Sequence, residues 1–471
     1  MTSTSTTTST IPELATGRSP AGSVRIPELR NIPVTDRIQN IIDHPAFQRL
    51  RRVRMLGPTC FVYPGAVHSR FEHSLGVFGY VRRFLSSLLD HPNFADSVTE
   101  TDLLTLLAAG LLHDIGHYPF AHSLEALHLK GEDTPRHEVV GGDIILGNHP
   151  SLRGDRPIAE LLQEQWGISP QRMISLCTGE LGDDPDPVDR LLHSVISGTI
   201  DADKMDYLER DSHHIGVPYG RTFDRERLLA SLTLNADDDE IAIEAKGKVP
   251  AEMFVFARYT MFSEVYWHHT VRAASSMVES AIAAFYSRTA FDQHRLLEAL
   301  LTHNDDTFLK WLYDQSPDNS APRHLIDGLL PGQRRLYKRI ATYSRAYVEI
   351  EKREAFNRIY QMNRASLSDL TARLSARLGS AVGRPLHPAS LIVDIPPRDK
   401  DELETIDVVY PRVSGQRYYP LHELSRIIAG IQDDFISVVK KIRIFAHPDI
   451  ADDLRSLDDL DSMLLDEILA T

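Results

Sequence analysis

The chain has 471 residues, of which 42% are hydrophobic and 25% charged, the profile of a globular protein large enough for two or three domains. Its 51 Lys and Arg residues against 66 Asp and Glu residues give a net charge of −15, which disfavours extended contact with nucleic acid or with an anionic membrane. Two cysteines are too few for a disulfide scaffold or a thiolate zinc cluster and suit a reducing compartment, so we expect a cytoplasmic protein.

The chain begins with a polar segment. Residues 2–10 are all Ser or Thr, without the basic and apolar regions of a secretion signal, and we predict a disordered tail over residues 1–22. The longest apolar stretch, residues 103–112, is far shorter than the roughly 20 residues of a membrane span. We therefore expect no membrane segment.

Helical periodicity dominates the first half of the chain. Apolar residues return every three or four positions, as in Ile38, Ile41 and Ile42 and again over residues 77–88. Thr101-Asp102 and Asp186-Pro187 are typical helix starts. Residues 249–288 are expected to hold either one very long helix or two joined helices.

The texture changes towards the C-terminus. Short β-rich runs cover residues 390–394, 406–410 and 442–445, and a closing helix is predicted over about residues 450–469. Residues 317–331 are rich in Asp, Asn, Pro and Gly and read as a linker or as a loop within one domain. We predict a mainly α protein, with a helical core over residues 23–330 and a small α+β part over residues 331–471.

One dipeptide stands out among the 21 histidines: His113-Asp114, at the end of the apolar run 103–112. Neighbouring helical residues point roughly 100° apart, so both can flank one ion only if further ligands arrive from other helices. A helix end with an ordinary surface carboxylate would account for the same pair.

His73 and Asp203 are the candidates for those further ligands. Two imidazoles with two carboxylates form a mixed nitrogen and oxygen set that suits Mn, Fe, Zn or Mg. A half-buried His73 bonded to protein groups, with Asp201, Asp203 and Asp206 as a solvated acidic helix face, is the alternative without a metal.

Six strings follow one another along the chain: Phe47-Gln-Arg-Leu-Arg51, Tyr63-Pro-Gly-Ala66, Arg70-Phe-Glu-His-Ser-Leu-Gly76, Leu112-His-Asp-Ile-Gly-His117, Pro119-Phe-Ala-His122 and Asp201-Ala-Asp-Lys-Met-Asp-Tyr-Leu-Glu-Arg-Asp-Ser-His-His214. In this order they resemble the HD-domain phosphohydrolases. The similarity is greatest to their branch of deoxynucleoside triphosphate triphosphohydrolases, and it covers about residues 30–290.

The resemblance implies an HD-domain helical core and a divalent metal cofactor, Mn, Mg, Fe or Zn. The implied ligands are His73, His113, Asp114 and Asp203. Such an ion polarises a phosphoryl oxygen and lowers the pKa of a coordinated water.

Four further residues are implied to act in catalysis. His122 and Glu125 share a helix face if the helix continues, and a carboxylate on one imidazole nitrogen raises the basicity of the other. An exposed surface pair is the alternative interpretation. His137 and Glu138 match a second active-site pair of the family and would otherwise read as a polar helix start.

Phosphate contacts are implied for Arg70, His117 and Lys204, which lie beside the proposed ligands. A triphosphate needs such charge-assisted hydrogen bonds, and the sequence has no Walker A loop to replace them. Pairing of these cations with nearby acids is the alternative.

The nucleoside side rests on another set. Tyr207 and Asp211 match residues that contact the deoxyribose, and Arg258 and Tyr266 match residues that line the base pocket. Leu56 matches the leucine of a Gln-Leu pair at the substrate. Unaided, Tyr259, Tyr266 and Trp267 would read as an aromatic stripe in a buried helix.

Two positions depart from the family. Met55 replaces the glutamine that helps to read the sugar, and Trp267 replaces a glutamine that contacts the base in the vertebrate-type enzyme. Both changes put the identity of the nucleotide in question and leave the phosphate chemistry intact.

A second nucleotide site is also implied. Asp43, Gln48 and Arg51 match residues that bind an activating guanine nucleotide in some members of the family. An upstream motif of that site is replaced here by residues 31–35. The alternative is a solvated or subunit-facing basic helix, formed by Arg49, Arg51, Arg52 and Arg54.

The leading hypothesis is metal-dependent hydrolysis of a deoxynucleoside triphosphate to the deoxynucleoside and tripolyphosphate. One alternative is an HD phosphatase acting on a monophosphate, a ribonucleotide or an alarmone. The other is a nucleotide-sensing or nucleic-acid-binding protein with a vestigial site. The resemblance also implies a homo-oligomer, a dimer or tetramer, while the charge makes nucleic-acid binding weak at most.

Overall fold

The computed structural model describes residues 11–15, 22–125, 127–129, 132–133, 136–288, 292–396, 405–410 and 417–470. Most of the predicted polar tail, residues 1–10 and 16–21, lies outside the described residues. Over the described ranges, no helix is both long and apolar enough to cross a membrane.

Helices form most of the structure, which confirms the mainly α class. The helices of the N-terminal half are α2 (Asp36–Ile42), α3 (Pro45–Arg49), α4 (Arg70–Leu88), α5 (Pro92–Ser97), α6 (Glu100–Leu112), α7 (Ala121–Glu125), α8 (His137–Leu146), α9 (Ile158–Leu161), α10 (Pro170–Thr178), α11 (Pro187–Ile196), α12 (Ala202–Ile215) and α13 (Arg225–Leu229).

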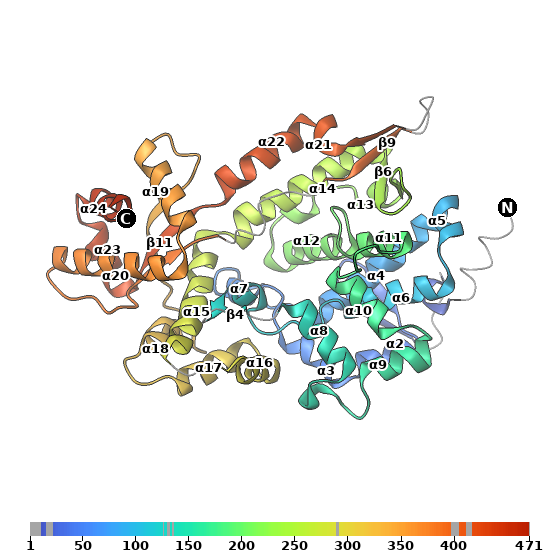
Figure 1. The fold of residues 1–471 in the computed structure, drawn as a ribbon, viewed down its shortest axis with the longest axis horizontal. Coiled ribbons are helices and arrows are strands. Elements are labelled where there is room, and N and C mark those ends of the chain that lie inside the picture. Colours follow the sequence, from blue (N-terminus) through green and yellow to red (C-terminus); the bar gives the residue numbers. More distant parts are fainter. Residues whose placement is uncertain are drawn as a thin grey trace.

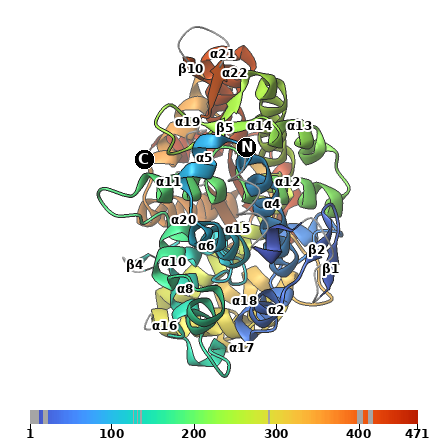
Figure 2. The same ribbon diagram turned by 90° about the vertical axis from the view of Figure 1, so that its right-hand side faces the viewer.

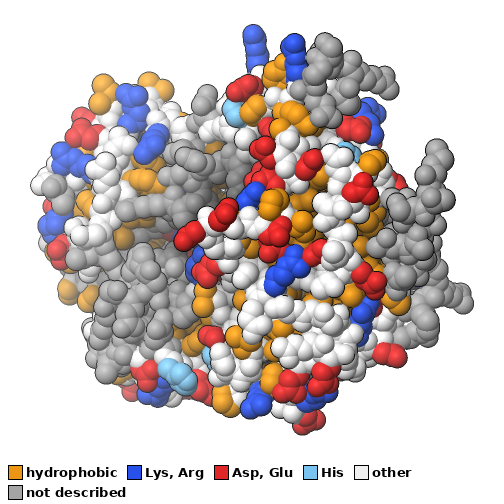
Figure 3. All heavy atoms as spheres, turned by 45° about the vertical axis from the view of Figure 1, so that its right-hand side comes forward, with side chains coloured by type: hydrophobic (Ala, Val, Ile, Leu, Met, Phe, Trp, Pro, Cys, Tyr) orange, Lys and Arg blue, Asp and Glu red, His pale blue; other side chains and the backbone are white. Residues whose placement is uncertain are grey.

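The C-terminal half adds α14 (Lys248–Met261), α15 (His269–Arg288), α16 (Gln293–Thr302), α17 (Asp305–Gln315), α18 (Ala321–Ile326), α19 (Ile350–Gln361), α20 (Arg364–Ala381), α21 (Leu421–Leu424), α22 (Arg426–Asp434), α23 (Pro448–Arg455) and α24 (Leu460–Leu469). In Figures 1 and 2, α21 and α22 lie beside α14 at the top, and α16, α17 and α18 lie at the opposite end. Figure 3 shows acidic, basic and hydrophobic side chains interspersed over the described part of one face, without a continuous basic track there.

Residues 11–15, which the tail prediction included, pack against the helical core. Ile11 is 1% exposed, and the fully buried Glu13 accepts hydrogen bonds from Arg37 and Thr35. Burial opposes the ionisation of Glu13, but these partners hold its pKa below the ordinary value. A buried carboxylate needs such partners, so the side chains from α2 fix this short segment in place.

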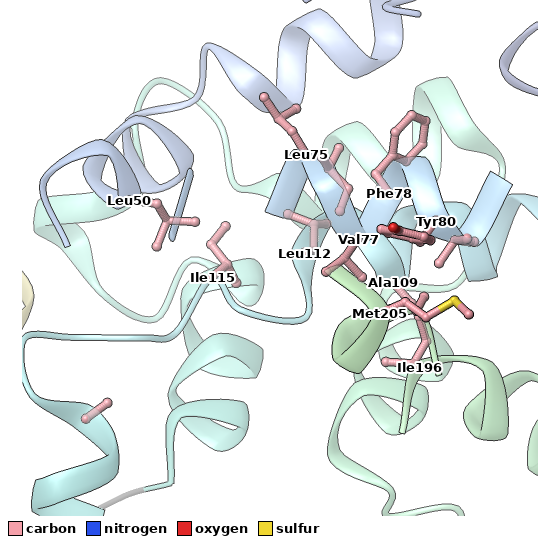
Figure 4. Packing of buried hydrophobic residues seen from close by; sticks show 14 of the residues in the cluster. Leu50, Leu75, Val77, Phe78, Tyr80, Ala109, Leu112, Ile115, Ile196 and Met205 are labelled. Carbon is pink, nitrogen blue, oxygen red and sulfur yellow. The ribbon is translucent and has the colours of Figure 1, made fainter. Parts of the chain in front are cut away.

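The central core lies between α4, α6 and α12. Residues 103–112 are apolar on every side, as in a helix surrounded by protein, and Leu106 and Leu107 are fully buried. Figure 4 shows Leu75 of α4, Leu112 of α6 and Met205 of α12 in one packed cluster. This packing sets the directions of the three helices that carry the candidate metal ligands.

A sheet joins the core to a returning C-terminal segment. Its order is β10-β9-β6-β5, and β6 pairs in parallel with β9, with Ile243 opposite Val408. Both residues are fully buried. The strands are β5 (Leu232–Leu234), β6 (Ile241–Glu244), β9 (Asp407–Tyr410) and β10 (Arg417–Pro420), and two hairpins are formed by β1 (Ser23–Ile26) with β2 (Arg30–Pro33) and by β3 (His128–Leu129) with β4 (Glu132–Asp133).

A second, smaller lobe surrounds the sheet β7 (Lys338–Tyr343), β11 (Ile442–Ala446) and β8 (Leu391–Asp394), in the order β7-β11-β8. The two faces of this sheet are buried in different cores, because Ile392 and Phe445 join the large core whereas Val393 and Ile444 join the small one. Helix α15 contacts β7 and β8, and α19, α20 and α23 also contact the sheet. The sheet is therefore a layer between the two lobes.

The predicted division at residue 330 does not follow these cores. Val408 and Ile428, from the predicted C-terminal part, are buried in the large core. After the helical core, the chain forms part of the small lobe. The segments β9, β10 and α22 then pack on the helical core again, and the last helices belong to the small lobe. Strand pairing between β6 and β9, distant in sequence, produces this return.

Residues 249–288 form two joined helices. Helix α14 continues into a π-helix, η8 (Phe262–Tyr266). The helical conformation is then interrupted at Trp267 and His268, and α15 follows. Trp267 N donates to Phe262 O at 3.0 Å and closes the π-helical turn. The prediction had left one helix or two open, and this break decides for two.

Two predictions were wrong. Residues 317–331 contain α18, whose Leu325 and Ile326 are buried, so they are neither a linker nor simply a loop within one domain. Residues 450–469 form α23 and α24 rather than one helix. Helix α6 begins at Glu100, one residue before the predicted start at Thr101, and its capping box is formed by Thr99 and Asp102. The predicted strands at 390–394, 406–410 and 442–445 are confirmed to within a residue or two.

Candidate metal centre and active site

The four candidate metal ligands come together from three helices. His73 lies in the first turns of α4, His113 and Asp114 directly follow α6, and Asp203 lies in the first turn of α12. His73 Nε2 is 3.0 Å from Asp203 Oδ1 and 3.6 Å from Asp114 Oδ2. His113 Nε2 is 3.4 Å from Asp114 Oδ1 and 3.9 Å from Asp203 Oδ1. These distances let the four side chains surround one ion.

The other ring nitrogen of each histidine is held by protein. His73 Nδ1 lies 2.9 Å from Asp206 Oδ2, and His113 Nδ1 lies 3.2 Å from Gly110 O. Each Nε2 is therefore directed at the carboxylates, where it is buried without hydrogen-bond geometry to any described residue. Buried nitrogens without a hydrogen bond are rare, and a metal ligand whose second nitrogen is fixed in this way is one explanation of them.

The charges around the site favour a cation. Burial opposes charge on both partners, but His73 lowers the pKa of Asp203 to about 2, and Asp203 and Asp206 raise the pKa of His73 to about 10. Arg70 and His117 hold the pKa of the buried Asp114 well below its usual range. The carboxylates are thus ionised at neutral pH, and a divalent ion would replace the proton that they stabilise on His73. The donor set fits such an ion.

Asp206 is itself fixed by a buried arginine. Arg210 donates from Nε to Asp206 Oδ2 at 2.7 Å and from Nη2 to Oδ1 at 2.6 Å. On its other side, Asp206 packs against Gly76, where no side chain would fit, because a Cβ at position 76 would lie 1.9 Å from Asp206 Oδ1. A glycine one turn after His73 therefore permits the carboxylate that orients His73.

The candidate acid and base residues form a neighbouring cluster. Glu125 Oε1 lies 2.6 Å from His137 Nδ1 and accepts from His137 N at 2.8 Å, whereas Glu125 Oε2 lies 3.4 Å from His122 Nδ1. The sequence analysis assigned Glu125 to His122 alone, and here it serves both rings. Glu138 Oε2 lies 3.6 Å from His137 Nδ1, and the His122 side chain is 56% exposed. His122 is thus the member of this cluster that is open to an incoming ligand.

His117 connects this cluster to the metal candidates. Its Nδ1 lies 2.9 Å from Asp114 Oδ1, and its ring lies 3.6 Å from that of His137 and 5.0 Å from that of His122, between centroids. Burial and the charge of Arg70 hold the pKa of His117 well below its usual range. A neutral His117 can offer a nitrogen to a ligand, since neither of its buried ring nitrogens has hydrogen-bond geometry to a described residue.

The two candidate phosphate cations are paired with acids. Arg70 Nη1 donates to Asp114 Oδ2 at 2.7 Å, and Lys204 Nζ lies 2.6 Å from Asp201 Oδ2. Asp201 also caps α12 through Lys204 N, and its burial raises its pKa to about 6. The alternative of acid partnering, left open by the sequence, thus describes both contacts as they stand here.

The candidate sugar and base residues meet at Asp211. Tyr266 donates from its hydroxyl to Asp211 Oδ2 at 2.7 Å, and its ring centroid lies 6.3 Å from that of Tyr207. The guanidinium of Arg258 lies 5.8 Å from the ring centroid of Phe262. Burial raises the pKa of Tyr207, and the charge of Arg258 partly opposes this rise. Tyr259 and Tyr266 both pack against the buried cluster that Trp267 forms with Phe435 and Val439. An aromatic cluster therefore does form at this end of α14, as the alternative interpretation expected.

Leu56 lies beside the arginine of the metal site. The carbonyl of the preceding Met55 accepts from Arg70 Nη2 at 3.3 Å, and Leu56 O accepts from Thr59 N. The substituted position 55 is therefore buried against Arg70, with its side chain 9% exposed.

The candidate regulatory residues lie near the surface. Arg51 donates to Gln48 Oε1 at 2.8 Å and lies 3.6 Å from the centroid of the Phe71 ring, whereas Asp43 is exposed and accepts from Gln39. The structure brings Gln48 and Arg51 together, whereas Asp43 is bonded to Gln39. The idea of a uniformly solvated basic helix is wrong for Arg49, whose guanidinium is buried and donates to the Ile115 carbonyl.

Sequence reasoning missed the residues that hold the site in place. Asp201 and Asp206 are 0% and 1% exposed, so the solvated acidic face is wrong for these two. His68 Nε2 lies 2.8 Å from Asp211 Oδ1, which leaves Asp211 held from both sides. A signal was present in the spacing of three and four residues along α12, which places such side chains on one helix face.

Two family profiles match the chain. The HD domain matches residues 70–193, and the HD associated region matches residues 223–460. The first range contains His73, His113 and Asp114, whereas Asp203 lies between the two ranges.

Known relatives share part of the chain. It is 38% identical over 251 residues to the uncharacterised protein YwfO of Bacillus subtilis and 29% identical over 323 residues to the human deoxynucleoside triphosphate triphosphohydrolase SAMHD1. These matches cover 53% and 61% of this chain. The chain spans about half the length of these relatives, 52% and 50%.

Solved structures share the fold. A hypothetical protein from Aquifex aeolicus superposes with a TM-score of 0.63 at 24% identity, over 92% of this chain and 98% of the other. A phosphohydrolase from Bacteroides thetaiotaomicron gives 0.64 at 23% identity, over 90% and 99%.

The close approach at Gly76 predicts a loss of metal affinity in Gly76→Ala. Displacing Asp206 frees the His73 ring, and disturbing such a partner typically costs about 10–100-fold in metal affinity. Titration of the metal-free protein with Mn²⁺ by calorimetry measures this. Gly430→Ala, on an open face of α22, is the matched control and should bind as wild type. Equal affinity in both variants would contradict the role of Asp206.

The Glu125–His137 pair predicts a pH-dependent stability. Burial opposes both charges, yet the pair raises the pKa of His137 and lowers that of Glu125. The pair therefore contributes its full stabilisation between about pH 4.5 and pH 6.5, the pKa values of Glu and His in the unfolded chain. This stabilisation is lost as the pH rises through the raised pKa of His137.

We expect Glu125→Gln to lower the melting temperature by roughly 2 °C at pH 6 and by much less at pH 9. Thermal melts across this range measure the difference. Glu160→Gln, from an exposed pair with Arg156, should show a small difference at every pH. A loss in Glu125→Gln that does not shrink at high pH would contradict the assignment.

Proposed function

Because the chain belongs to the HD-domain family of phosphohydrolases and carries the HD associated region, we propose that it hydrolyses deoxynucleoside triphosphates to the deoxynucleoside and tripolyphosphate. The observation that carries the proposal is the convergence of His73, His113 and Asp114, which Asp203 joins through its approach to both histidines, with the cluster of His117, His122 and His137 directly beside them. The likeness to the human triphosphohydrolase supports the choice of substrate.

The proposed metal ligands are His73, His113, Asp114 and Asp203, and the ion is Mn, Mg, Fe or Zn. When bound, a divalent ion supplies polarisation of a phosphoryl oxygen and acidification of a water. The part of the protein is to hold the triphosphate against Arg70, His117 and Lys204. Arg70 and Lys204 would each bind a phosphate oxygen, either in place of their acidic partner or together with it. Charge-assisted hydrogen bonds to a carboxylate and to a phosphate are both strong.

In the proposed reaction, a water oxygen bonds to the α-phosphorus, the water releases a proton to the solvent, and the bond from phosphorus to the 5′-oxygen breaks. His122 gives a proton to the departing 5′-oxygen, and Glu125 stabilises the protonated ring beforehand. Support comes from the exposed His122 ring and from its contact with Glu125. His137 and Glu138 are proposed to hold Glu125 in place and to keep the local charge balanced.

On the nucleoside side, Asp211 is proposed to accept a hydrogen bond from the 3′-hydroxyl, and Tyr207 to lie against C2′. Arg258 and Tyr266 would line the base, with Leu56 on the sugar side. Support comes from the Tyr266 hydroxyl on Asp211 and from the neighbouring rings of Tyr207 and Tyr266. Asp43, Gln48 and Arg51 remain a proposal for an activating nucleotide.

We also propose a cytoplasmic homo-oligomer, a dimer or tetramer, that binds nucleic acid weakly or not at all. Support for assembly comes from exposed apolar residues on adjoining helices: Val249 and Phe256 on α14 are 64% and 41% exposed, and Ile427 on α22 is 61% exposed. Support for weak nucleic-acid binding comes from the net charge of −15.

A nucleotide panel tests the substrate. With Mn²⁺, we expect the purified protein to release tripolyphosphate and deoxynucleoside from one or more deoxynucleoside triphosphates, measured by phosphorus NMR and chromatography. Orthophosphate or pyrophosphate without tripolyphosphate would favour an HD phosphatase acting on a monophosphate, ribonucleotide or alarmone. No bound metal and no turnover with Mn²⁺, Mg²⁺ or Fe²⁺ would favour a sensing protein with a vestigial site.

The proton donor predicts a specific kinetic defect. His122→Asn should lower kcat by about 10²–10⁴-fold, the usual contribution of a general acid, while the metal content stays that of wild type. Steady-state kinetics and elemental analysis measure both. His294→Asn, on an exposed position of α16, is the matched control and should be unchanged. A kcat within threefold of wild type in His122→Asn would remove His122 from this role.

A further inference from the structure

The chain leaves regular α-helix where it supplies Tyr266 to the site. The π-helix η8 ends at Tyr266, and the break at Trp267 and His268 follows. Such π-helical turns are rare and occur frequently at functional sites. Carbonyls at the end of a helix have no partner in that helix, so the Trp267 carbonyl needs a donor from outside it.

The small lobe supplies this donor. Arg443 on β11 donates from Nη2 to Trp267 O at 2.8 Å, and Arg443 is 5% exposed. The Trp267 ring packs on Phe435, with 5.7 Å between centroids, and clusters with Val439, both from the π-helix η10 (Phe435–Val439). The backbone and side chain that follow Tyr266 are thus both held by residues far downstream in the chain.

Asp394 ties the same arginine to α15. Arg272 binds Asp394 with two nitrogens, Nη2 to Oδ1 at 2.6 Å and Nε to Oδ2 at 3.2 Å, and Ser276 Oγ donates to Oδ1 at 2.7 Å. Arg443 Nη1 lies 3.9 Å from Asp394 Oδ2. Asp394 is 3% exposed, and a buried carboxylate between two guanidiniums is costly to separate. The β8–β11 pair is therefore fixed relative to the start of α15.

The contrast with the metal side is clear. The contacts given above for His73, His113 and Asp114 all lie within residues 70–206. Tyr266 instead lies directly before the carbonyl that the small lobe binds. The small lobe therefore contacts the backbone directly after Tyr266, on the proposed nucleoside side of the site.

We propose that Arg443 is a positioning residue that, by binding the Trp267 carbonyl, sets the Tyr266 hydroxyl on Asp211 and so determines affinity for the nucleoside part of the substrate. The phosphate chemistry stays with the helical core. This proposal rests on the proposed function for the identity of the substrate. It deepens that function by adding a specificity role for the small lobe.

A double-mutant cycle tests the proposal. Arg443→Met and Tyr266→Phe should each raise KM for the deoxynucleotide about 10-fold, with kcat within about threefold and the metal content unchanged. The double variant should also show about a 10-fold rise, because Arg443 acts through Tyr266. Arg377→Met, which removes a surface pair with Asp466, is the control and should leave KM unchanged.

Multiplied effects of about 100-fold in the double variant, or an unchanged KM in Arg443→Met, would overturn the proposal. If Arg443→Met does not fold, Arg443→Lys takes its place. Lysine keeps the charge beside Asp394 but loses the forked geometry, so an intermediate rise in KM is expected. A wild-type KM in Arg443→Lys would then overturn it.

A readout without substrate separates this proposal from the proposed function. In a background carrying Trp166→Phe and Trp311→Phe, Trp267 is the remaining tryptophan of the three in the chain. Arg443→Met should shift its fluorescence emission, whereas Arg377→Met should not. An unchanged emission would overturn the positioning role, even if the wild type hydrolyses no deoxynucleotide and the proposed function fails.

Discussion

Buried charge at the meeting point of α4, α6 and α12 is the constraint on which the rest of this structure depends. Carboxylates and imidazoles that leave water are tolerated only where each has a partner of opposite charge or a hydrogen bond. Arg210 meets this need for Asp206, Asp206 meets it for His73, and Arg70 meets it for Asp114. The Nε2 atoms of His73 and His113 face the carboxylates of Asp114 and Asp203 without hydrogen-bond geometry to them, and a cation placed among these groups would bind all four.

Helix α12 joins the two halves of the site. Asp203 and Asp206 face the metal candidates, and Tyr207 and Asp211, one and two turns later, face Tyr266. One helix thus sets the distance between the proposed metal ligands and the proposed nucleoside contacts. The overall charge of −15 opposes extended contact with a polyanion, whereas a bound divalent ion together with Arg70 and Lys204 would meet a nucleotide locally, so an acidic protein can still hold one.

Much of the fold was predictable where local patterns decide it. The apolar run 103–112, the cap at Asp186 and the β-rich runs at 390–394 and 442–445 all correspond to elements near the predicted residues. Errors arose where distant contacts decide. The parallel pairing of β6 with β9 returns Val408 and Ile428 to the large core, and burial of Leu325 folds a Pro- and Asp-rich segment into α18.

The sequence by itself determined the inventory of the site, because His73, His113, Asp114 and Asp203 carry donor types and motif positions that do not depend on the fold. Tertiary structure alone decided which groups share a proton or a partner. It placed Glu125 on His137 as well as on His122, buried Asp206, and joined Trp267 to Arg443 across 176 residues of chain. The physical reason is that donor chemistry is a local property of a residue, whereas burial and hydrogen-bond geometry arise only when helices distant in sequence pack together.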